Sequence, residues 1–183
     1  MKAKTLEKLD SLNQRLQDLR RQWSGHTADQ LNYRPEPGVW SALDNLQHLR
    51  LSEGLSHEYL KKKLKGNIED IPKAGMSARL RAMGVTLFMR SGRKRQAPKM
   101  VDESSFPERS ELTDILDQWH TQRQELRAFL EKQPEGVFER EAYRHPFAGR
   151  LSLLGMLRFF ESHFERHFKQ AEERLAAARE AEA

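Results

Sequence analysis

The chain has 183 residues, of which 32% are charged, and it contains no cysteine. A chain of this length can bury a core of its own, and without cysteine it has neither disulfides nor thiolate-bound metal. No apolar run approaches the roughly 20 residues that cross a bilayer, and no apolar leader follows Met1. These features predict a single domain over residues 1–183, in a soluble cytoplasmic protein without a membrane segment.

The formal net charge of +5 is unevenly distributed along the chain. Between Lys61 and Met100 there are twelve Lys and Arg residues and only two acidic residues. The only aromatic residue in this stretch is Phe88, and no nucleic-acid-binding motif accompanies the charge. We therefore expect a basic connecting segment over about 64–108, mostly exposed and with a short helix at 77–89, rather than a nucleic-acid site.

Four long helices are predicted in chain order. The first covers Lys4 to Trp23, where leucines recur every three or four positions. The second begins at Ser41 and ends near Lys63. Its Ser41 and Asp44 resemble a capping box, in which each residue accepts a hydrogen bond from the backbone of the other.

The third helix covers about 110–132 and the fourth about 152–179, each with an apolar stripe on one side. Segment 25–38 contains Pro35 and Pro37 and is expected to be extended, whereas 135–151 is expected to be a loop. No segment alternates with period two, so no strand is predicted. The fold class is all-α, a four-helix bundle with a long crossover connection.

Histidine is the residue type most informative about chemistry in this chain. His163 and His167 are four residues apart on the fourth helix, so both rings project from one side, at the edge of the buried stripe. Such a pair can bind a metal ion through two nitrogens, although two ordinary buried or surface histidines remain the alternative. Phe164 follows His163, so the pair is not the HExxH motif of zinc proteases.

A third ligand has to come from another helix. On the second helix His48 faces inward, whereas His57 lies on the opposite side of that helix and cannot join it. A weaker alternative is His120 on the third helix, while His145 lies in a loop that could cover the site. Asp44 precedes His48 by four residues, and it either supports that histidine or only caps the helix.

Three segments carry a family resemblance. The stretch 34–41 reads RPEPGVWS and is followed by His48-Leu49, the stretch 145–149 reads HPFAG, and 163–167 reads HFERH. In order and spacing these segments resemble the DinB-like superfamily. The resemblance implies a four-helix bundle with a crossover, often dimeric, and a divalent metal held by His48, His163 and His167.

The resemblance also implies a class of activity. Superfamily members include transferases and isomerases that use a low-molecular-weight thiol, and metal-dependent hydrolases without a known substrate. We therefore expect a metal-dependent enzyme, a thiol S-transferase or a hydrolase, with zinc or nickel, a small-molecule substrate and a homodimeric state. The alternative is a non-enzymatic stress-response or interaction module with a structural metal. Phe164 stands where many relatives have Glu, which bears on substrate preference.

Overall fold

The computed structural model describes residues 1–92 and 99–182. Its helices are α1 (Lys2–Trp23), α2 (Ala28–Asn32), α3 (Ala42–Lys63), α4 (Met76–Arg90), α5 (Leu112–Glu131) and α6 (Leu153–Glu182). Two strands, β1 (Tyr143–His145) and β2 (Gly149–Leu151), form an antiparallel hairpin. Short 3₁₀ turns are η1 (Ile68–Asp70), η2 (Lys99–Val101), η3 (Glu103–Ser105) and η4 (Glu135–Glu139).

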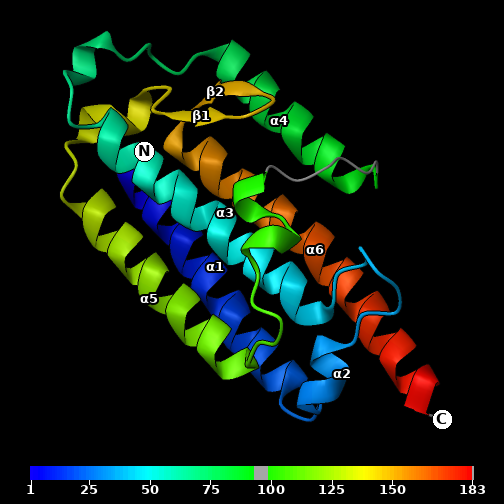
Figure 1. Cartoon of the computed structure of the whole chain (residues 1–183). Coiled ribbons are helices and arrows are strands. Elements are labelled where there is room, and N and C mark those ends of the chain that lie inside the picture. The colour runs from blue at the N-terminus through cyan, green and yellow to red at the C-terminus, as the bar shows by residue number, and fades with distance from the viewer. Residues whose placement is uncertain (93–98, 183) are drawn as a thin grey trace.

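The long helices α1, α3, α5 and α6 form the predicted four-helix bundle (Figure 1). The start of α1 meets the end of α5, where Lys2 Nζ donates to the carbonyl oxygen of Gln133 at 2.8 Å. In the same way α3 and α6 run antiparallel, with Asn45 beside His167. Helices α3 and α5 run in the same direction because α4 and the η2–η3 segment return the chain along the bundle (Figure 1). The expected crossover is therefore present.

The first turn of α3 is fixed by Ser41, Asp44 and Arg34. Ser41 Oγ accepts from the backbone N–H of Asp44 at 3.0 Å, and Asp44 Oδ2 accepts from the N–H of Ser41 at 2.8 Å. The same carboxylate receives two hydrogen bonds from Arg34, both 2.7 Å long. Burial favours the neutral acid, but these hydrogen bonds outweigh it and lower the pKa of Asp44. Asp44 therefore acts as a helix cap, the second of the two roles considered for it.

A buried ion pair joins three helices in the bundle interior. Glu53 on α3 and Arg123 on α5 have side chains only 3% and 1% exposed, and two hydrogen bonds of 2.8 and 2.7 Å connect them. Arg123 also donates to the carbonyl oxygen of Leu12 on α1, and Trp119 Nε1 donates to Glu53. Each of these polar groups thus has a partner, which offsets the cost of removing it from water.

The structure corrects two expectations about the connecting segments. Segment 135–151 contains the β1–β2 hairpin, whose three-residue strands are too short to show an alternating pattern. Gly149, at φ 77°, supplies the left-handed backbone conformation that this turn requires. Segment 25–38 contains α2, where Thr27 and Gln30 form a capping box that sequence analysis could have recognised.

Helix α4 confirms the short helix predicted within the basic connecting segment, but one side of it is buried. Ala78, Ala82 and Val85 pack inward, and a side chain at Gly155 of α6 would meet the Cβ of Ala82 at 3.5 Å. Residues 93–98 of the basic segment lie outside the described residues. Among the helices described, none combines the length and apolar content needed to cross a membrane.

Candidate metal centre

The structure brings the three predicted histidines together between α3 and α6. His48, His163 and His167 are 5%, 7% and 8% exposed, and one ring nitrogen from each lies within 4.8 Å of the others. The Nε2 atoms of His48 and His163 are 3.1 Å apart. In tetrahedral coordination, zinc–nitrogen bonds of 2.0–2.1 Å place two ligand nitrogens about 3.3 Å apart. The three side chains therefore fit a divalent metal ion without a change of fold.

The other histidines considered from the sequence lie elsewhere. His57 packs its ring against Phe129, with centroids 5.4 Å apart. His120 forms a hydrogen bond to Gln124 at the surface. In residues 1–92 and 99–182, neither of these histidines belongs to a group that could hold a metal ion.

Two hydrogen bonds orient the candidate ligands. His48 Nδ1 lies 2.7 Å from the carbonyl oxygen of Val101, and His167 Nδ1 lies 2.8 Å from Asn45 Oδ1. Each oxygen accepts the Nδ1 proton, so the lone pair of each ring is on Nε2 and faces the group. Sequence analysis missed both partners. Asn45 lies about one helical turn before His48, and this spacing could have indicated a polar side chain next to the histidines. The carbonyl of Val101 belongs to the backbone of the crossover, and no side-chain pattern in the sequence indicates it.

Aromatic rings pack around the three imidazoles. Trp40 lies 5.0 Å from the ring of His48 and 6.0 Å from that of His167, and Phe159 stacks on His163 at 5.1 Å. Phe106 packs against Trp40 in a T-shaped arrangement, with ring centroids 5.3 Å apart. These contacts restrict rotation of the imidazoles and shield them from water.

Burial sets the protonation state of the group. It lowers the pKa of His48, against an opposing effect of the hydrogen bond to Val101. For His163 and His167, burial, together with the neighbouring histidines and Arg166, holds the pKa well below the ordinary value of about 6.5. All three rings are therefore neutral at pH 7, which is the form that binds metals.

The group faces a cavity of about 790 Å³ between α3, α6, the η2–η3 segment and the hairpin. Far along α3 from the histidines, Ser56 Oγ lies 3.0 Å from Tyr143 Oη, and burial raises the pKa of Tyr143 to about 12. His145 also lines the cavity, and its Nδ1 accepts from the backbone N–H groups of Phe147 and Ala148. The volume of the cavity is large enough for a small molecule that reaches the histidines.

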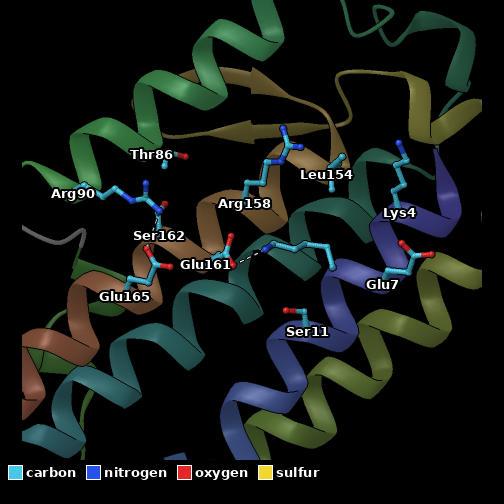
Figure 2. Close-up of a pocket in the computed structure, with 11 residues that line it drawn as sticks. Lys4, Glu7, Ser11, Thr86, Arg90, Leu154, Arg158, Glu161, Ser162 and Glu165 are labelled. Atoms are coloured by element: carbon cyan, nitrogen blue, oxygen red, sulfur yellow. Dashed lines mark hydrogen bonds and ion pairs between the residues drawn. The ribbon is translucent and has the colours of Figure 1, made fainter. Parts of the chain in front are cut away.

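A second hollow, of about 450 Å³, lies between α1, α4 and α6 (Figure 2). Its walls carry both signs of charge. Lys8 pairs with Glu161 at 2.5 Å, and Arg90 lies 3.4 Å from Glu165. Because its walls carry both signs of charge, the hollow does not favour a ligand of one charge, and we do not consider it a functional site.

The donor set determines what a bound metal ion can do. Within the described parts of the chain, no fourth histidine or carboxylate joins the group, and the sequence has no cysteine. Structural zinc sites are closed by four protein ligands, whereas catalytic sites keep a position open. A metal held here has at least one position available for water or a ligand from the cavity.

Comparison with known proteins agrees with this geometry. The family model of the DinB superfamily matches residues 11–171, which include all three histidines and most of the bundle. Neither the curated proteins nor the solved structures contain a match to the chain. The match covers most of the chain, and the crossover bundle with its buried histidine group agrees with it. The protein belongs to the DinB superfamily.

Proposed function

We propose that the protein is a metal-dependent enzyme that acts on a small molecule at His48, His163 and His167. The reaction we propose is transfer of a low-molecular-weight thiol, with hydrolysis as the second possibility. The observation that carries the proposal is a three-nitrogen donor set that opens onto a cavity of about 790 Å³. Zinc and nickel are the proposed ions, because imidazole nitrogen suits both.

A bound dication with three neutral ligands would supply a strong Lewis acid, which lowers the pKa of water or a thiol that it binds. The protein's own groups orient and enclose this site. Val101 and Asn45 hold two of the rings in the ligand tautomer, and Trp40 and Phe159 limit the access of water. The phenol of Tyr143 is neutral at pH 7 even at its ordinary pKa, and burial raises that pKa to about 12, so any hydrogen bond to a substrate comes from a neutral hydroxyl.

A spectroscopic experiment tests whether the site accepts a thiol. Protein reconstituted with Co²⁺ is titrated with cysteine, and a thiolate-to-metal charge-transfer band is the expected result. The His163→Ala variant should lack this band, whereas His120→Ala, a control outside the histidine group, should retain it. If Co²⁺ binds but neither cysteine nor glutathione changes its spectrum, the thiol-transfer proposal is wrong, and hydrolysis of ester and amide substrates becomes the test of the second reaction.

Chelation separates the enzymatic proposal from a structural role of the metal. A structural ion contributes folding free energy directly, so its removal unfolds the domain. In this bundle the core consists of apolar stripes on four helices, and we expect the helical circular dichroism signal to persist after chelation. Loss of most of the helicity in the metal-free protein would favour the structural role.

A further inference from the structure

We propose that the outer side of α4 is a docking surface for an acidic amphipathic helix of a partner protein. Four large apolar side chains of this helix are exposed: Met76 (67%), Leu80 (58%), Met83 (59%) and Leu87 (66%). We call these four the α4 seam. Scattered apolar residues on a surface are normal, but a continuous row of them marks an interaction site. The metal centre contributes no residue to this row.

The spacing of the α4 seam favours a helix as its partner. The four residues follow one another at intervals of four, three and four, which places them within about 60° around the helix and over about 16 Å along it. Intervals that alternate between three and four are the pattern of the a and d positions of a coiled coil. Helices that lie on lipid usually bury a broader apolar face than this narrow row.

Helix α4 is held firmly in the position that exposes the seam. Arg81 donates to Glu141 at 2.7 Å and to the carbonyl oxygen of Arg150 at 2.9 Å, which ties the helix to the hairpin. On its inner side Ala82 and Val85 are buried. A partner therefore meets a preformed surface and does not bear the entropic cost of ordering this helix.

The charge around the seam favours an acidic partner. The described residues 71–92 and 99–101 contain five Lys and Arg and no Asp or Glu. Arg79 flanks the seam, is exposed, and has no ion pair within the described part of the chain. Arg90 is 64% exposed, and its guanidinium lies 3.4 Å from Glu165. Acidic residues beside an apolar stripe would complement this surface, whereas a second copy would bring two basic segments together.

Two synthetic helices test the proposal on the full-length, metal-loaded protein. Both peptides carry the same apolar stripe of Leu and Ile, flanked by Glu in one peptide and by Lys in the other. Binding of each peptide to the protein is measured by fluorescence anisotropy. We expect the Glu peptide to bind at least tenfold more tightly. The double variant Leu80→Gln, Met83→Gln should lose at least tenfold in affinity for it, and a melting curve checks that this variant folds.

The contribution of charge is tested by Arg79→Gln, with Lys132→Gln as the matched control at an exposed cation outside the seam. An exposed ion pair accounts for a roughly two- to fivefold change in affinity, so Arg79→Gln should weaken binding of the Glu peptide by about that factor and Lys132→Gln should not. Equal binding of both peptides, or of neither, would overturn the proposal. The proposal would also be overturned if the protein alone forms a dimer that dissociates in the Leu80→Gln, Met83→Gln variant. Binding of the protein to phosphatidylglycerol vesicles in a flotation assay would overturn it as well.

Discussion

Asn45 is the residue that connects the helical scaffold to the orientation of a candidate ligand. Its side-chain amide bonds on one side to the carbonyl oxygen of Ser41, at 2.8 Å, and on the other to His167 Nδ1, also at 2.8 Å. The capped start of α3 and the ring on α6 are thereby held together. Such outer contacts are expected to set the affinity for a metal almost as strongly as the ligands themselves.

We predict that Asn45→Ala weakens metal binding roughly 10- to 100-fold, because the His167 ring loses the acceptor that fixes its tautomer. Gln47→Ala is the matched control, since Gln47 is a buried amide on the same helix that bonds to Ser110 instead. Competition with a chromophoric chelator measures both affinities. An equal loss of affinity in the two variants would mean that the effect is general damage to α3.

The three neutral imidazoles also predict how the metal-free protein responds to acid. In the folded protein their pKa values lie below the value of about 6.5 in an unfolded chain. Below pH 6.5 the unfolded chain therefore binds protons that the folded chain does not, and the folded state loses stability as the pH falls. With one to three protons involved, we expect a loss of about 1 to 4 kcal/mol per pH unit.

Urea denaturation of the metal-free protein at pH 7.5 and pH 5.5 measures this loss. Replacing His48, His163 and His167 together by Gln should make the stability much less dependent on pH over this range. The His26→Gln variant, outside the group, should retain the dependence of the parent chain. A triple variant as acid-sensitive as the parent would show that other groups are responsible.

At the scale of elements, the buried ion pair between α3 and α5 is sensitive to a single change, because each partner is the buried counter-charge of the other. We predict that Glu53→Gln destabilises the fold by about 3–5 kcal/mol, because it leaves the Arg123 guanidinium buried without a counter-charge. Asp10→Asn is the control, since Asp10 is exposed and pairs with the half-buried Arg127, and should cost less than about 1 kcal/mol. Denaturant midpoints of the two variants give the comparison, and similar losses would contradict the assignment.

The extent to which sequence predicts these elements depends on their length. The helices α1, α3, α5 and α6 repeat their apolar residues over several turns, so their positions follow from periodicity. The hairpin has three residues in each strand, and its existence depends on tertiary contacts that a short pattern does not contain.

At the candidate site, too, local patterns predict some features, while others depend on tertiary contacts. Helical phase placed His48, His163 and His167 on inward faces, but the acceptor at Val101 is backbone from the distant crossover.

At the scale of the whole molecule, the bundle and the candidate site use different parts of the same helices. Leu46 and Leu49 of α3 are fully buried in the apolar core, while Asn45 and His48 of the same helix face the cavity. The crossover and the hairpin then cover that cavity from outside the bundle. Because the core does not depend on the histidines, the chain can change its ligands without losing its fold.

This separation predicts the outcome of ligand substitution in the intact protein. We expect His48→Ala to retain the helical content and a cooperative melt, since the apolar stripes of four helices remain in place. The variant should lose its bound metal because two histidines remain where three are needed. Circular dichroism checks the fold. An unfolded variant would mean that the histidine group itself holds the bundle together.

The most direct test of the account is the metal content of protein that was purified without a metal-affinity tag. Elemental analysis should find close to one divalent ion per chain in the parent protein, and less than a tenth of that in His48→Ala and His163→Ala. The control variant His120→Ala, outside the histidine group, should match the parent. A parent chain that contains no metal and binds neither zinc nor nickel at micromolar concentrations, or a His48→Ala variant with full metal content, would contradict the assignment of His48, His163 and His167 as a metal centre.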